Sequence, residues 1–336
     1  MNTSTAVFSA DVLKIDAAAV SASIESQIRD IVLQRLNRKG VVVAISGGID
    51  SSVVAALCFH ALGTTRVLGL MLPEADSSPD SLQFANLLAQ SLGLRTYTEN
   101  MAGILTAAGC YQRRDEAIRK VIPEYTTGYK CKIVLPDQVN GTAYPIFSVV
   151  VESPLGERTK ARLTLDSYLG VVAATNFKQR TRKMMEYYYA DLFNYAVVGT
   201  PNRLEYDQGF FVKNGDGAAD LKPIAHLYKT QVYQLAAYLG IPQEIQKRPP
   251  TTDTYPLDQS QEEFYFPLPY DRMDLCLYAK NHGLQPEEVA PVLELTTEQV
   301  DRVYRVIDAT RNATRYLHRR PVLCEEVPEV ENDRRV

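Results

Sequence analysis

The chain has 336 residues, of which 46% are hydrophobic and 23% charged, and its formal net charge is −4. This length allows one large or two small domains, and the lack of a basic block argues against a nucleic-acid partner. No apolar run approaches the roughly 18 residues that a membrane span needs, and we expect no signal peptide. The five scattered cysteines form no CxxC pair, which predicts reduced thiols in a cytoplasmic protein.

The first hundred residues alternate strand and helix patterns. Residues 1–10 are predicted to be a flexible tail, followed by a helix over residues 16–37. Apolar, β-branched runs predict buried parallel strands at residues 41–45, 67–73 and 94–99, with a helix after each of the first two. This βαβαβ order predicts an α/β fold with a doubly wound parallel sheet, whose ligand lies at the C-terminal ends of the strands.

The rest of the chain is predicted to contain a β insertion and C-terminal helices. The insertion spans about residues 114–163, with strands at 132–135 and 144–151 joined by a turn at Asn140–Gly141. Helices are expected at residues 165–193, 224–239, 270–281 and 296–318, a fourth core strand at 195–200, and an acidic tail at 322–336. The main domain therefore covers residues 11–321. Aromatic side chains on the 165–193 helix could face a dimer partner or the core.

The first strand breaks into Ser46-Gly47-Gly48-Ile49-Asp50-Ser51-Ser52, followed by an apolar helix. A strand, a glycine turn and a helix aim backbone N–H groups and a helix N-terminus at an anion, and the serines add hydroxyl donors. Asp50 would repel a phosphate unless a divalent cation lies between them. The loop lacks the Gly-Lys-Ser/Thr of a Walker motif.

This loop resembles the SGGxDS signature of the PP-loop ATP pyrophosphatases, which split ATP into AMP and pyrophosphate. Further segments make the chain similar to the ammonia-dependent NAD synthetases, which have an adenine nucleotide alpha hydrolase-like fold. They are Gly199-Thr200-Pro201-Asn202-Arg203-Leu204-Glu205, Lys229-Thr230-Gln231 and Pro250-Thr251-Thr252-Asp253. The last of these resembles the PTAD loop that closes over the site in that family.

The resemblance implies an ATP site and a magnesium site. Asp50, Lys229 and Thr251 would be catalytic, and Asp50 and Glu205 would bind Mg²⁺. ATP would be bound by Ser46, Gly47, Gly48, Asp50, Ser51, Ser52, Thr200, Lys229 and Thr251. An isolated Glu or Lys would ordinarily be a solvated charge, so these assignments depend on the surrounding motifs.

The resemblance also implies a site for the acceptor, nicotinic acid adenine dinucleotide. Residues 209–220 resemble the family's GFFTKxGDGGxD, except that Val212 and Ala218 replace a Thr and a Gly. Residues 176–182 resemble NxKxRxR, which the family uses around the acceptor and at its dimer interface. The acceptor-binding residues would be Asn176, Arg180, Lys213, Asp216, Asp220, His318 and Arg319.

The predicted reaction adenylates the nicotinate carboxylate with ATP, and ammonia then displaces AMP to form NAD. We expect no glutaminase domain, so ammonia would be used directly or supplied by a separate protein, and we expect a homodimer. One alternative is a related AMP-forming amide ligase that acts on another carboxylate, because of the insertion and the changes at Val212 and Ala218. A catalytically silent nucleotide-binding protein is disfavoured, since Asp50, Glu205 and Lys229 are all present.

Overall fold

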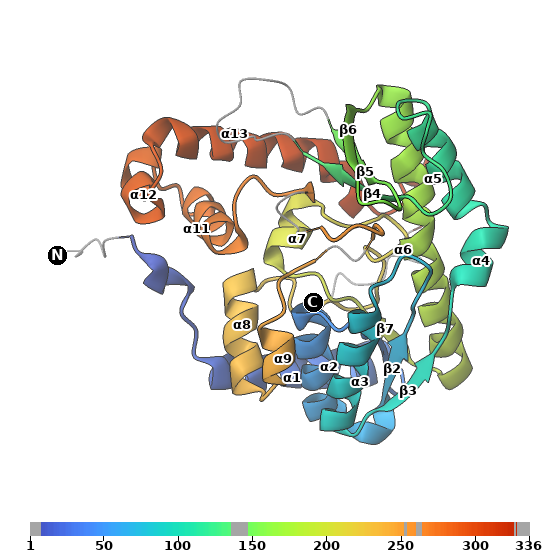
Figure 1. Ribbon diagram of the computed structural model, residues 1–336. Helices are drawn as coiled ribbons and strands as arrows, with labels where there is room; N and C mark the ends of the chain where they lie inside the picture. The colour runs from blue at the N-terminus through green and yellow to red at the C-terminus, as the bar shows by residue number, and fades with distance from the viewer. Residues whose placement is uncertain (1–7, 136–146, 252–253, 260–263, 326, 328–336) are drawn as a thin grey trace.

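The computed structural model describes residues 8–135, 147–251, 254–259, 264–325 and 327. A four-stranded parallel sheet in the order β3-β2-β1-β7 lies at its centre (Figure 1). Its strands are β1 (Val41–Ala44), β2 (Val67–Met71), β3 (Arg95–Thr98) and β7 (Ala196–Val198). Strand β1 pairs with β2 and with β7, so that Val41 lies beside Val67 and Ala196. The doubly wound parallel sheet predicted from the sequence is confirmed.

Side chains of β1 alternate between two cores, one on each face of the sheet. Val41 and Val43 pack with the helices α1 (Ala17–Asp30), α2 (Ile49–Leu62), α3 (Pro79–Leu92) and α8 (Lys229–Tyr238). Val42 packs on the other face with α4 (Ala102–Ala107), α5 (Cys110–Arg119) and α6 (Leu165–Phe193). Helix α2 is apolar on nearly every side because it is buried at the centre of the first core.

The predicted insertion folds as a separate antiparallel sheet in the order β4-β5-β6. Its strands are β4 (Lys130–Val134), β5 (Ser148–Glu152) and β6 (Arg158–Arg162). A turn joins β5 and β6, with the Gly156 N–H donating to the Ser153 carbonyl at 2.9 Å. The turn predicted at Asn140–Gly141 lies outside the described residues. Figure 1 places this sheet beside one end of α6, away from the parallel sheet.

The C-terminal helices form a third layer. They are α11 (Tyr270–Asn281), α12 (Pro286–Leu293) and α13 (Thr297–Thr314), and the sequence analysis did not predict α12. Phe8 and Leu13 are buried among them, so Phe8, which was predicted to be part of the flexible tail, is packed. Shorter helices are α7 (Arg203–Gln208), α9 (Gln243–Gln246), the 3₁₀ helices η1 (Ala10–Leu13), η3 (Thr64–Arg66) and η4 (Arg315–His318), and the π-helix η2 (Ile31–Arg35).

Helix α8 is shorter than the sequence predicted, since it begins at Lys229 and not at residue 224. Instead, the Leu227 N–H donates to the Ile224 carbonyl at 2.9 Å in a separate turn, and the Gln231 side chain accepts the Tyr228 N–H at 3.0 Å where the helix starts. The start of α8 therefore places Lys229 in its first turn. Within the described part of the chain, no helix combines the length and the hydropathy needed to cross a membrane.

Candidate active site

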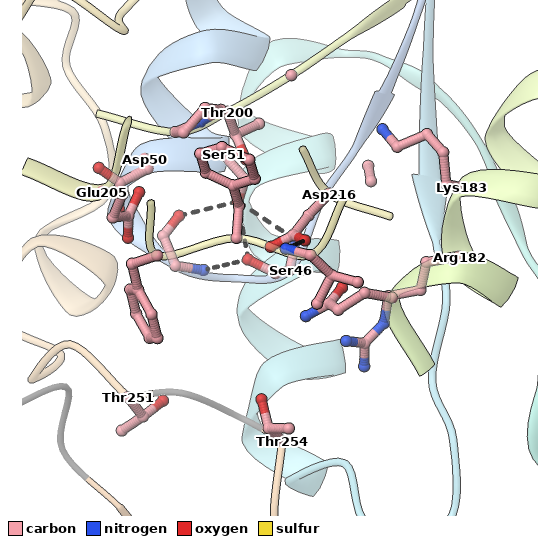
Figure 2. Close-up of a pocket in the computed structure, with 18 of the residues that line it drawn as sticks. Ser46, Asp50, Ser51, Arg182, Lys183, Thr200, Glu205, Asp216, Thr251 and Thr254 are labelled. Carbon is pink, nitrogen blue, oxygen red and sulfur yellow. Dashed lines mark hydrogen bonds between the residues drawn. The ribbon is translucent and has the colours of Figure 1, made fainter. Parts of the chain in front are cut away.

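A cavity of about 590 Å³ opens at the C-terminal ends of β1, β2 and β7. Figure 2 shows Asp50, Thr200 and Glu205 at one end of this cavity, Arg182 and Lys183 of α6 at the other, and Thr251 and Thr254 below them. The strand ends, α6 and the chain around residue 250 thus supply three of its walls. This is the position that the doubly wound sheet predicts for a ligand.

The turn after β1 depends on Gly47. Its φ of +77° is one that side-chain-bearing residues rarely adopt, and a Cβ there would lie 2.5 Å from the Ser81 carbonyl oxygen. Gly48 is the N-cap of α2, so the buried start of that helix faces the cavity with Asp50 in its first turn. This arrangement is suited to an anion at the helix N-terminus.

The serines of the turn divide into two groups. Ser46 and Ser51 line the cavity with their hydroxyl oxygens 3.1 Å apart, and the Ser46 hydroxyl accepts the Gly48 N–H at 3.3 Å. Ser52 is fully buried and donates to the Gly48 carbonyl at 2.8 Å. Ser46 and Ser51 can therefore contact a ligand, whereas Ser52 stabilises the turn from behind.

Asp50, Asn202, Glu205 and Lys229 form one polar cluster at the cavity wall. The Asn202 side-chain amide donates to Asp50 at 3.1 Å, and the Asn202 backbone N–H donates to Glu205 at 3.1 Å within the capping box of α7. The Lys229 ammonium contacts the Asp50 carboxylate. Burial alone would lower the pKa of Lys229, but the carboxylates of Asp50 and Glu205 outweigh it, so its pKa is raised and the ammonium stays charged.

The two carboxylates in this cluster suit a magnesium ion. Mg²⁺ is commonly held by one or two protein carboxylates together with substrate phosphates and water. Among the described residues, no group of three or more His, Cys, Asp or Glu side chains is placed to hold a metal ion without such help. Asp50 and Glu205 thus fit a cation that arrives with a phosphate ligand.

Helix α6 turns a polar face toward the cavity. Asn176, Arg180, Arg182 and Lys183 line it, and Lys183 is buried and paired with Glu186 at 2.7 Å. Asp216 lies opposite, where burial raises the pKa of its carboxyl group although it accepts the Val212 N–H at 2.7 Å. This end of the cavity can bind the charged and polar groups of a second substrate.

The C-terminal segment closes the side of the cavity near Lys213. The Lys213 ammonium donates to the carbonyls of Tyr316 at 2.9 Å and Arg319 at 3.3 Å. The His318 ring lies edge-on to Phe211 at 5.1 Å, and burial together with Lys222 lowers the pKa of His318. The cavity lining includes Tyr316 and Leu317 of this C-terminal segment but neither His318 nor Arg319, whose role in acceptor binding stays a prediction.

The structure brings most of the predicted residues to this one cavity. Its lining includes Ser46, Gly48, Asp50, Ser51, Asn176, Arg180, Thr200, Glu205, Lys213, Asp216, Lys229 and Thr251. Gly47 and Ser52 form the back of the turn. Asp220 lies behind β7, where its carboxylate accepts the Val197 N–H at 2.7 Å and the Tyr187 hydroxyl at 3.3 Å. The predicted role of Asp220 in acceptor binding stays a prediction.

Sequence reasoning assigned no role to Arg248 or Asn202. Arg248 donates to Ser81 at 2.8 Å and to the Gly47 carbonyl at 3.3 Å, so it joins the segment before Thr251 to the turn. Because Arg248 directly precedes Pro249-Pro250-Thr251, its position in the sequence could have marked it as a candidate site residue. Asn202 stood inside a recognised segment, but its link to Asp50 depends on the pairing of β1 with β7.

This chain is similar to several known proteins. A model of the NAD synthase family matches residues 20–123 and 154–316. The NH(3)-dependent NAD(+) synthetase of Rhizobium rhizogenes is 56% identical over 319 residues, which cover 95% of this chain and 96% of the relative. The NH(3)-dependent NAD(+) synthetase of Thermotoga maritima is 34% identical over 286 residues, which cover 84% of this chain and 92% of the relative. The solved structure of an NMN synthetase from Francisella tularensis shares the fold, with a TM-score of 0.64 at 22% identity. The match covers 92% of this chain and 99% of that one.

Proposed function

Because the chain belongs to the NAD synthase family, we propose that it forms NAD from nicotinic acid adenine dinucleotide and ammonia, splitting ATP into AMP and pyrophosphate. The family uses ATP as a co-substrate. The observation that carries the proposal is the cluster of Asp50, Glu205 and Lys229 beside the Ser-Gly-Gly turn. Three relatives that are 55–56% identical are called NH(3)-dependent NAD(+) synthetases, which favours this acceptor over another carboxylate.

The turn and α2 are the binding site that we propose for the ATP phosphates. Backbone N–H groups at the N-terminus of α2 and the hydroxyls of Ser46 and Ser51 would donate to phosphate oxygens. Lys229 would stabilise the negative charge that builds on the α-phosphoryl group when the nicotinate carboxylate attacks it. Asp50 and Glu205 would hold Mg²⁺, which when bound neutralises the phosphate charge. Thr200 and Thr251 would add hydroxyl contacts from facing walls.

The acceptor would lie along α6 and the 209–220 segment, with its charged groups near Asn176, Arg180 and Lys213. Ammonia then attacks the acyl-adenylate carbon, the bond to AMP breaks, and the attacking nitrogen loses a proton. Asp216 is a suitable proton acceptor, because it lines the cavity and its pKa is raised by burial. The remaining catalysis is positioning, which needs no nucleophile from the protein.

We further propose that the enzyme is a homodimer in the cytoplasm. Helix α6 exposes the apolar side chains of Met184, Tyr188 and Leu192, which recur every four residues and so share one face. The five cysteines are free thiols, which is usual for a reducing compartment. Ammonia would come directly from solution or from a separate glutaminase.

The test is to measure AMP and NAD in one reaction that contains ATP, Mg²⁺, ammonium and nicotinic acid adenine dinucleotide. We expect equal amounts of the two products, and neither product from Asp50→Asn or Lys229→Met. The exposed Asp271→Asn is the matched control and should keep full activity. AMP without NAD, or AMP only after another carboxylate is added, would show that the acceptor assignment is wrong.

A further inference from the structure

The free edge of β4 is occupied by the chain that follows the Pro250-Thr251 turn. The Leu257 N–H donates to the Cys131 carbonyl at 3.2 Å, and the Lys132 ammonium donates to the Asp258 carbonyl at 3.0 Å. The buried Gln259 side chain donates to the Ile133 carbonyl. Residues 257–259 therefore lie along β4 as an added edge of the insertion sheet.

The same segment faces the cavity on its other side. Thr254 and Tyr255 line the cavity, and Tyr255 is only 5% exposed because it packs among the buried side chains of the insertion. Lys178 of α6 is almost fully buried and donates to the Thr254 carbonyl at 2.7 Å. Residues 254–259 are thus held by the insertion on one side and form part of the cavity wall on the other.

The insertion also supplies a cavity side chain of its own. Phe147, just before β5, lines the cavity and stacks on Tyr168 of α6 with ring centroids 4.5 Å apart. Val172, Thr175 and Phe264 line the cavity too. Aromatic and apolar side chains in a wall suit the flat face of a planar ring.

We propose that the insertion is a part of the substrate site. Strand β4 fixes residues 254–259 in place, and Phe147 with Tyr168 and Tyr255 forms a subsite for a heteroaromatic ring of a nucleotide substrate. Strands β4 and β5 both lie outside the stretches matched by the NAD synthase model, so this wall is additional to the matched part. The inference rests on the proposed function for the identity of the nucleotides, which are ATP and the dinucleotide.

The first experiment cuts the connection between β4 and the segment. Gln259→Leu removes one donor to β4, and Leu257→Pro removes the backbone donor to Cys131. Lys160→Ala on the exposed strand β6 is the control. We expect the dissociation constant of at least one nucleotide, measured by calorimetry with Mg²⁺, to rise about fivefold or more in Gln259→Leu and to stay unchanged in the control.

Leu257→Pro should weaken binding at least as much. The proposal is overturned if both variants fold and bind both nucleotides within twofold of the natural chain. If Leu257→Pro does not fold, Gln259→Leu alone decides the question.

The second experiment tests the ring subsite. Phe147→Ala should weaken binding of one nucleotide by about tenfold, whereas Leu155→Ala, at an 87% exposed apolar residue of the same insertion, should not. Weaker binding of ATP alone assigns the subsite to its adenine, and weaker binding of the dinucleotide alone assigns it to the acceptor. Unchanged binding of both excludes the subsite. Because binding is measured directly, a natural chain that binds nucleotides but forms no NAD would refute the proposed function separately.

Discussion

The side-chain amide of Asn202 donates a hydrogen bond of 3.1 Å to the carboxylate of Asp50. Asn202 is 1% exposed and also caps α7, where its side chain accepts the Glu205 N–H at 3.1 Å. One side chain therefore sets the positions of the two carboxylates that are proposed to bind magnesium. A hydrogen bond from a residue outside the coordination sphere orients the metal ligand, and its loss typically weakens metal binding by about 10- to 100-fold.

We predict that Asn202→Ser separates these two roles. Serine can still cap the helix, so the stability should fall by less than about 1 kcal/mol, but the donor to Asp50 is lost. The Mg²⁺ concentration for half-maximal AMP formation should rise by about tenfold or more. Thr296→Ala removes the cap of α13 and is the control, since it should lower the melting temperature without changing the Mg²⁺ dependence. An unchanged Mg²⁺ dependence in Asn202→Ser would contradict the prediction.

A substitution at Gly47 tests whether the turn after β1 needs a residue without a side chain. Gly47→Ala would place a Cβ 2.5 Å from the Ser81 carbonyl oxygen as well as straining a backbone with φ of +77°. We expect AMP formation to fall by about a hundredfold or more, because a displacement near 1 Å can cost that much. Gly63 has the same φ, and a Cβ added there would meet no other atom within 4 Å, so Gly63→Ala carries the strain alone.

Both alanine variants should be less stable by roughly 1–3 kcal/mol, but only Gly47→Ala should lose turnover. Steady-state rates and urea unfolding of the two proteins make the comparison. Equal losses of activity in both would mean that general destabilisation, and not the turn, explains the effect.

Asp274 predicts a pH dependence of stability. It is fully buried on α11, accepts the Thr230 N–H at 2.7 Å beside Lys229, and has a pKa raised to about 7 by burial. An Asp in an unfolded chain has a pKa of about 3.9. Between these values the folded chain keeps a proton that the unfolded chain has lost, so the free energy of unfolding falls as pH rises from about 4 to about 7.

Within that window, Asp274 lowers the free energy of unfolding by up to about 1.4 kcal/mol for each unit of pH. Asp274→Asn has no proton to lose and should flatten this part of the stability profile, while Asp271→Asn on the same helix should keep it. Urea unfolding at half-unit steps of pH measures the slope. A profile for Asp274→Asn that is as steep as that of the natural chain would refute the assignment.

The exposed apolar face of α6 predicts the oligomeric state. Leu192 is 57% exposed, and Leu192→Glu should convert a dimer into a monomer because a charge would be buried without a partner. Tyr238 is 54% exposed on α8, and Tyr238→Glu is the control that should leave the dimer intact. Light scattering during size-exclusion chromatography reports the mass. A natural chain that is monomeric would refute the proposed dimer.

Local patterns in the sequence were enough to predict the parallel sheet and the main helices. The β-branched run at Val41–Ala44 predicted β1, and the long helix at residues 165–193 has the bounds of α6. Helix α12 was not predicted because it has only eight residues and contains Pro291, so its periodicity is weak. The start of α8 was placed too early, since Ile224 and Leu227 have helical spacing but form a separate turn.

The cavity was predictable where one motif contained the whole contact, as in the Ser46–Ser51 turn. It was not predictable where contacts join distant segments. Arg248 reaches Gly47 across about 200 residues of sequence, and Gln259 reaches Ile133 only because the insertion folds beside α6. Such pairings depend on topology, which motif spacing alone does not specify.

The burial of Phe8 and Leu13 among the C-terminal helices has a consequence for how the chain is made. The Gln234 side-chain amide holds the backbone next to Leu13, because it donates to the Leu13 carbonyl at 2.9 Å and accepts the Ile15 N–H at 3.1 Å. The partners of Phe8 come mostly after residue 266. Phe8 and Leu13 therefore find most of their final neighbours only after the chain beyond residue 266 has been synthesised, and until then their apolar side chains remain uncovered.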